Sequence, residues 1–289
     1  MESFSHRKGI KPPRDKLQVS SVDEDLRVGL WNTFKEVYWK EVGMFRIFNI
    51  PPYLYGTSIY FLHKRLLTDH FKIPLESEYI SSLAGIHSKV KELFFQSKWN
   101  EVYDFVEFVA RNYSDQSTCQ EFMRACNRVL EREQSAYRFV GGKIAEIISE
   151  MEVSEIEEAL QIPVSSVSMH LNRALELFSD RRSPDYRNSI KESISAVESL
   201  CRIITSNKNA TLQAALKEIE GNASIELHPA LSQGLRKLYA YTGDASGIRH
   251  ALKDKPTVYS EDAKFMLVAC SAFTNYLTEK ASKAGIDLQ

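Results

Sequence analysis

The chain has 289 residues, of which 43% are hydrophobic and 26% charged, and its formal net charge is −1. This length allows one large or two medium domains, each with a hydrophobic core. No stretch approaches the ~20 uninterrupted apolar residues of a membrane span, so we expect no membrane association. The near-zero net charge excludes the global cationic field that is typical of nucleic-acid-binding domains.

The four cysteines favour a reducing compartment. Cys119, Cys126, Cys201 and Cys270 all fall within helical patterns, and no two of them form a C-x-x-C motif. We therefore expect buried thiols and neither a disulfide framework nor a zinc site. Because the N-terminus also lacks the apolar region of a secretory signal, we expect the protein in the cytoplasm.

The N-terminal half predicts a series of amphipathic helices. The first begins in "SSVDEDLRVG", where Ser20 or Ser21 can act as the N-cap. Apolar residues then recur at helical spacing. The four predicted stripes contain Leu26, Leu30, Phe34, Val37 and Tyr38; Ile59, Leu62 and Leu66; Ile80, Leu83, Val90 and Phe94; and Trp99, Val102, Val106 and Val109. His63 and His70 lie near one helix face, but no third ligand is evident, so we expect no metal.

The segment "SAYRFVGGKIAEIIS" breaks this helical periodicity. Polar and apolar residues alternate on both sides of Gly141 and Gly142, which predicts a tight β-hairpin near residues 136–148. The two glycines are not followed by the Lys-Ser/Thr of a phosphate-binding loop. A turn-forming stretch, "FSDRRSPDYRNS", then indicates a domain border near residue 180, with one domain at 1–180 and another at 181–289.

The C-terminal domain opens with the best-patterned helix of the chain. Its apolar stripe consists of Ile190, Ile194, Val197, Cys201 and Ile204. A second stripe, of Asn188, Glu192, Ser195 and Ser199, should face away from the core. Such a stripe lets another backbone approach closely, or it lines a shallow groove. The alternative is a plain solvent face, and the pattern favours neither reading. Further helical patterns complete a bundle of four or five helices, so the fold class is mostly α.

A break between two of these helices carries the one combination of residues that suggests chemistry. "YTGDASGIRHALKDKP" places Arg249 and His250 side by side. Arginine holds phosphate bidentately, and histidine transfers protons near neutral pH. Together they can cleave a phosphodiester without a metal, provided the substrate has the 2′-hydroxyl of RNA. The alternative is a polar corner with a structural histidine.

Longer segments resemble known families. "FSHRKGIKPPR" followed by "DEDLRVGLWN" resembles the opening of the AbiJ N-terminal domain of bacterial abortive-infection proteins. "PDYRNSIKESISAVES", "YTGDASGIRHAL" and "DAKFMLVACSAFTNYL" are similar to the helical domain of the HEPN superfamily. Together these segments reach from near the N-terminus to the last helix.

The resemblance implies a phage-defence effector that cleaves RNA, including tRNA as a candidate substrate, as a homodimer and in response to a phage-derived trigger. It implies no cofactor. Arg249 and His250 take the place of the HEPN motif, whose histidine normally follows the arginine by four to six residues. Those positions hold Lys253, Asp254 and Lys255 in this chain. The alternative reading is therefore a catalytically degenerate HEPN-like dimer that binds RNA, nucleotide or a protein partner. Secondary candidates for lining the site are Glu192, Arg187, Asn188 and Asp244.

Overall fold

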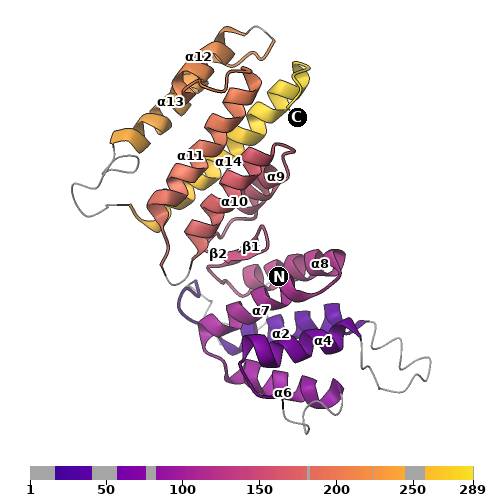
Figure 1. Cartoon of the computed structure of the whole chain (residues 1–289). Helices are drawn as coiled ribbons and strands as arrows, with labels where there is room; N and C mark the ends of the chain where they lie inside the picture. The colour runs from indigo at the N-terminus through magenta and orange to yellow at the C-terminus, as the bar shows by residue number, and fades with distance from the viewer. Residues whose placement is uncertain are drawn as a thin grey trace, which may run out of the picture. The chain divides into compact units, whose positions relative to one another are not determined.

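A computed structural model describes residues 17–40, 57–75, 83–180, 183–222, 224–244 and 258–288 (Figure 1). The fold is mostly helical with one small antiparallel hairpin, as the sequence predicts. The chain forms two compact units, Met1–Ile148 and Ser149–Gln289. Within the described ranges, each helix is too short or too polar to span a lipid bilayer.

The first unit packs short helices around an aromatic core. Its elements are α2 (Glu24–Tyr38), α4 (Ser58–Arg65), the π-helix η1 (Leu66–His70), α6 (Leu83–Gln96), α7 (Trp99–Asn112), α8 (Gln116–Arg132), β1 (Arg138–Val140) and β2 (Lys143–Ala145). The predicted apolar stripes supply this core wherever the structure describes them, and Trp99 is partly buried against it. Ile80 lies outside the described residues.

Helix α2 begins later than the serines suggested. Its N-cap is Asp23, whose carboxylate accepts a hydrogen bond from the Leu26 amide at 2.8 Å. The Asp23 amide itself donates to the side-chain oxygen of Gln18 at 2.7 Å, which fixes the extended backbone that a cap requires. The prediction of Ser20 or Ser21 as the cap is therefore wrong. Gly29 lets α2 approach α8 closely, because a Cβ there would lie 2.7 Å from Val129.

Aromatic rings from three helices form the centre of the first unit. Trp31 and Phe34 of α2 meet Phe94 of α6 and Phe105 of α7. Ring centroids are 4.7 Å apart for Phe94 and Phe105 and 5.4 Å apart for Phe34 and Phe105. Such offset and edge-on contacts stabilise the core beyond the area that they bury.

The predicted hairpin is confirmed. Strand β1 pairs antiparallel with β2 in the register Arg138↔Ala145 and Val140↔Lys143. Gly141 and Gly142 form the turn with φ of 53° and 80°. Both values lie in the left-handed region, where a glycine has no side chain to clash and a tight hairpin turn needs its central residues.

The described residues of the second unit form six helices. They are α9 (Glu150–Leu160), α10 (Ser165–Ser179), α11 (Tyr186–Ile204), α12 (Leu212–Gly221), α13 (Pro229–Asp244) and α14 (Ser260–Lys283). The border predicted near residue 180 falls inside this unit, between α10 and α11. The turn-forming residues there connect two helices that pack against each other, so polar composition marks a helix hairpin as readily as a domain border.

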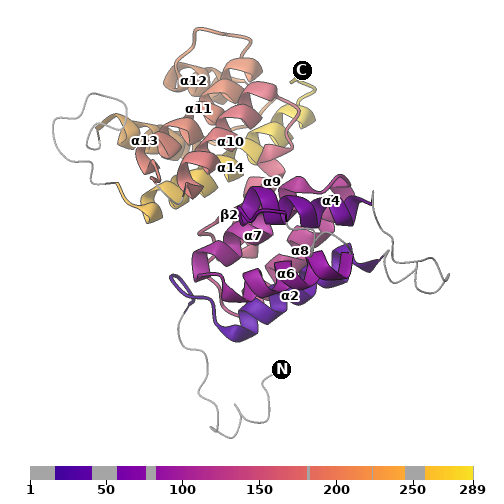
Figure 2. The same cartoon turned by 60° about the horizontal axis from the view of Figure 1, so that its bottom comes forward.

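Helix α11 occupies the middle of the second unit and packs against α10, α12 and α14 (Figures 1 and 2). Its predicted apolar stripe is buried. On the α10 side, the Ser189 hydroxyl donates to the Ala174 carbonyl oxygen at 2.8 Å, and the Ser199 hydroxyl donates to Ser166 at 2.7 Å. We call this contact the serine seam. Ser199 of the predicted stripe thus contacts α10, whereas Ser195 bonds to the Lys191 carbonyl oxygen of its own helix, so the stripe includes both a helix contact and a more exposed side chain.

The cysteines and the N-terminal histidines behave as structural residues. All four cysteines are buried and free, and burial raises the pKa of Cys201 and of Cys270 to about 12. His63 is fully buried and bonds through Nδ1 to the Ile59 carbonyl oxygen at 2.8 Å. Its Nε2 lies 3.1 Å from Nδ1 of His87. Burial lowers the pKa of His63 to about 3 and that of His87 to about 4, so both rings are neutral at pH 7.

Candidate functional site

The two predicted catalytic residues lie outside the described residues. Arg249 and His250 belong to the interval 245–257, which separates α13 from α14. Asp244 is the last residue of α13, and its side chain also lies outside the description. The roles of Arg249, His250 and Asp244 therefore stay predictions. The structure describes the elements on either side of the interval.

The end of α13 and the start of α14 are close enough for their side chains to interact electrostatically. Tyr241, in the last turn of α13, has a pKa raised by burial and by the negative charge of Asp262, in the first turn of α14. The first turns of α11 and α14 lie at the same end of the second unit (Figures 1 and 2). The chain enters the interval 245–257 from α13 and leaves it into α14, and Arg187 and Asn188 lie in the first turn of α11.

Asn188 has a structural task. Asp185 is the N-cap of α11. Its carboxylate accepts one hydrogen bond from the backbone N–H of Asn188 at 3.0 Å and a second from the side-chain Nδ2 of Asn188 at 2.6 Å. The side chain of Asn188 is therefore committed to fixing the helix start. Arg187, its neighbour, is half-buried in the same turn.

Glu192 forms a polar contact that joins α11 to α10. Its Oε2 lies 2.6 Å from Nδ1 of His170, which α10 places across the seam between the two helices. The side chains are 38% exposed for His170 and 24% exposed for Glu192, so solvent reaches the pair. The serine seam holds α10 and α11 together on either side of it, through Ser189 and Ser199.

This geometry fixes the chemistry available to His170. A carboxylate only accepts hydrogen bonds, so Nδ1 of His170 carries the proton and donates a hydrogen bond to Glu192. In the neutral ring, Nε2 is then unprotonated and can accept a proton, while the carboxylate fixes the orientation of the ring. A histidine oriented in this way and open to solvent can serve as a general base or acid.

One arginine lies near the pair on α10. Arg173 lies one turn along α10 from His170 and forms an exposed ion pair with Glu176 at 3.2 Å. Met169, beside His170, is 70% exposed. Across the described ranges, no three histidine, cysteine or acidic side chains gather as a metal would require. The pair can act on a substrate by proton transfer.

His170 was missed because the sequence gives it no local signal. It follows Met169 in an ordinary amphipathic helix, outside the apolar stripe formed by Val167, Leu171 and Leu175. One long-range signal exists, since His170 and Glu192 stand at equal distances from residue 181, in the connection between α10 and α11. An antiparallel helix hairpin brings such residues together, but the sequence alone had suggested a domain border there.

Fold and site define a mostly helical protein of two units, the second of which carries a solvent-accessible histidine–carboxylate pair. The model of AbiJ N-terminal domain 4 matches residues 2–161, more than half of the chain. The protein belongs to this AbiJ family, which connects it with abortive infection, a form of bacterial phage defence. No curated protein and no solved structure matches the chain. The family match ends within the loop after α9, so α10 to α14 lie beyond it.

Proposed function

We propose that the protein is a cytoplasmic effector of abortive infection that cleaves RNA without a metal, as a homodimer with a HEPN-like second unit. A phage-derived trigger would start the activity, and tRNA is a candidate substrate. Membership of the AbiJ family supports the defence role. The observation that carries the proposed chemistry is the His170–Glu192 pair, because it adds an oriented proton-transfer group to the unit that also contains Arg249 and His250.

The proposed reaction needs one base, one acid and one positive charge. One histidine takes the proton of the 2′-hydroxyl, and the 2′-oxygen attacks the phosphorus. The bond from phosphorus to the 5′-oxygen breaks, and the second histidine gives that oxygen a proton. Arg249 stabilises the negative charge on the pentacoordinate phosphorus. The products are a 2′,3′-cyclic phosphate and a 5′-hydroxyl end, without any change of oxidation state.

The Arg249–His250 motif provides one histidine, whereas the proposed reaction needs two. A single imidazole cannot be base and acid in the same step, and no histidine follows His250 in the chain. His170 supplies the second imidazole from α10. A dimer offers a further copy of each group at a shared cleft.

The test is an RNA cleavage assay in EDTA with total RNA and with a tRNA pool. We expect cleavage by the wild type, and losses of about 100-fold or more for Arg249→Ala, His250→Ala and His170→Ala. Glu192→Gln keeps the shape but removes the charge behind His170, so we expect a smaller loss and an altered pH–rate profile. Met169→Ala, beside His170 on the exposed face of α10, is the matched control and should cleave like the wild type.

The results of this assay distinguish the RNA-cleaving effector from the dimer that only binds. Cleavage that requires Arg249 and His250 but not His170 would confine the chemistry to the motif. Cleavage that survives all three substitutions would place the active site elsewhere. Absence of cleavage, in the presence and absence of phage lysate, would contradict the enzyme and favour the degenerate dimer that binds without cleaving. A monomeric mass by light scattering at micromolar concentration would contradict the shared cleft.

A further inference from the structure

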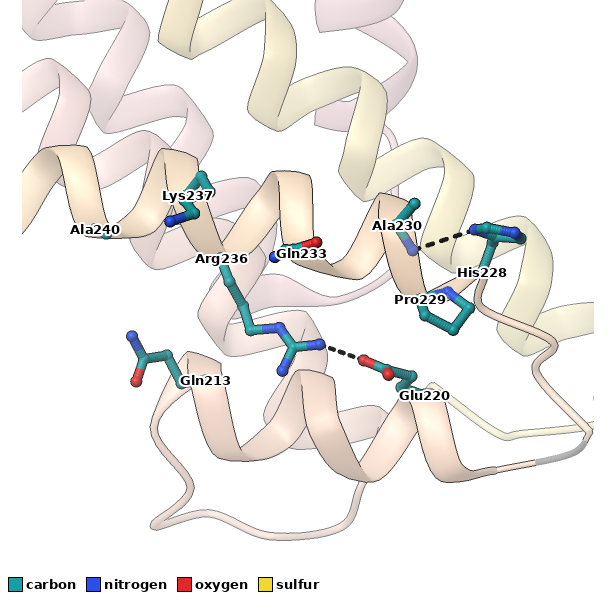
Figure 3. A pocket seen from close by; sticks show the side chains of 9 residues that line it. All are labelled: Gln213, Glu220, His228, Pro229, Ala230, Gln233, Arg236, Lys237 and Ala240. Atoms are coloured by element: carbon teal, nitrogen blue, oxygen red, sulfur yellow. Dashed lines mark hydrogen bonds and ion pairs between the residues drawn. The ribbon is translucent and has the colours of Figure 1, made fainter.

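A polar cavity lies between α12 and α13, away from the seam that holds His170. Its volume is about 710 Å³. Six of its lining side chains are polar: Gln213, Glu220, His228, Gln233, Arg236 and Lys237 (Figure 3). Cavities of roughly 300–1,000 Å³ hold small-molecule ligands, so the size suits a compound larger than a simple ion.

Arg236 is held in a fixed position within this cavity. Its Nη2 donates to the hydroxyl of Ser232 at 3.0 Å, and Ser232 is fully buried. The same nitrogen forms an ion pair with Glu220 of α12. Figure 3 shows the guanidinium between the two helices, with Gln213 on one side and Glu220 on the other. Within the described part of the chain, the hydrogen bonds of Arg236 all use Nη2, which leaves Nη1 for a ligand.

His228 contributes another donor at the start of α13. Its Nδ1 accepts a hydrogen bond from the Ala230 amide at 3.1 Å, as the side chain of a capping residue does. The proton of the neutral ring therefore sits on Nε2, which can donate to a ligand. The exposed amides of Gln213 and Gln233 can donate as well.

The charges of the lining residues favour an anion. Arg236 and Lys237 carry two positive charges, and Glu220 supplies the single carboxylate, which Arg236 already neutralises. Lys237 is exposed one position along α13, so its ammonium is available to a ligand. A planar guanidinium beside a mobile ammonium is a combination that suits phosphate oxygens.

We propose that this cavity binds a small ligand that carries phosphate groups, with Arg236 and Lys237 as the phosphate ligands. His228, Gln213 and Gln233 then donate to the remaining oxygens or to the body of the ligand. The ligand is either a free oligophosphate or a nucleotide, and both present the same phosphate chemistry. This site lies on different helices from His170 and Glu192.

Isothermal titration calorimetry of the full chain tests the proposal, with inorganic phosphate, pyrophosphate, AMP and ATP as probes. We expect saturable binding of pyrophosphate, ATP or both. Tighter binding of ATP than of pyrophosphate would identify a nucleotide, and equal binding a free oligophosphate. Arg236→Ala should weaken binding by about tenfold or more, and Lys237→Ala by several-fold, because each removes a charge-assisted contact. Glu220→Gln should tighten it, since a competing negative charge is lost.

Lys217→Ala is the matched control, because Lys217 is exposed on α12 and lies outside the cavity lining. If this variant loses as much affinity as Lys237→Ala, the effect is nonspecific electrostatics and the site is overturned. Absence of saturable binding for every probe overturns it as well. Should Arg236→Ala disturb folding, Lys237→Ala and Gln213→Ala, which change exposed side chains, decide the question.

Discussion

The two units of this protein are held together by different means. The first relies on large aromatic rings, with Phe105 at the centre of a cluster that includes Trp31 and Phe94. The second brings α10 and α11 together through serines, whose small side chains let the helices approach. The aromatic core encloses His63 and partly covers His87, both as neutral rings, whereas the serine-lined interface leaves His170 accessible. Packing by small residues therefore keeps a helix surface available for chemistry.

The largest expected effect comes from removing an aromatic ring. Phe105 is fully buried, so Phe105→Ala should cost the first unit about 3–5 kcal/mol of unfolding free energy. All three tryptophans of the chain lie before residue 148, so tryptophan fluorescence during urea denaturation reports this unit alone. Phe265→Ala, at a side chain that is 58% exposed on α14, is the control and should leave that transition unchanged. An equal effect of both variants would contradict the aromatic core.

The buried histidines predict that acid weakens the first unit. The pKa of His63 is about 3 in the folded chain and 6.5 ordinarily, so below pH ~6.5 the unfolded chain binds a proton that the folded chain refuses. This lowers the unfolding free energy as the pH falls, by about 2 kcal/mol at pH 5 for His63. Burial lowers the pKa of His87 as well, and the positive charges of Lys35 and Lys91 lower it further, so His87 also lowers the unfolding free energy as the pH falls.

Tryptophan-detected urea denaturation at pH 7 and pH 5 measures this effect. His63→Gln should flatten the pH dependence, even if it lowers stability at pH 7. His228→Gln changes an exposed histidine of the second unit and should leave the pH dependence of this transition unchanged. A pH dependence that survives His63→Gln unchanged would assign the effect to other groups.

The smallest expected effect concerns the serine seam. Ser189→Ala removes a buried hydrogen bond between α11 and α10, so we expect a loss of about 1 kcal/mol. Ser195→Ala is the matched control, because the Ser195 hydroxyl bonds only to the Lys191 carbonyl oxygen of its own helix. Ser195→Ala should leave the stability of the protein unchanged. Far-UV circular dichroism follows both variants on heating, and identical melting curves would contradict a stabilising seam.

Local patterns were sufficient to predict the apolar helical stripes and the hairpin. The stripe on α2 lies in the core because its spacing follows the turn of a helix, and Gly141 and Gly142 allow the positive φ that a tight hairpin needs. The cap of α2 was missed because Ser20 and Asp23 are both good capping residues, and the contact from Gln18 decided between them. Arg249 and His250 stay predictions from the sequence.

By itself, the sequence determined the helical class, the hairpin and the buried stripes, since each depends on residues within a few positions of one another. Tertiary structure decided the border between the units, because it depends on which helices pack together, and α10 packs with α11. It also decided that His170 meets Glu192 and that Arg236 meets Glu220. These contacts join residues on different helices, and the direction and spacing of two packed helices are set by all the side chains between them.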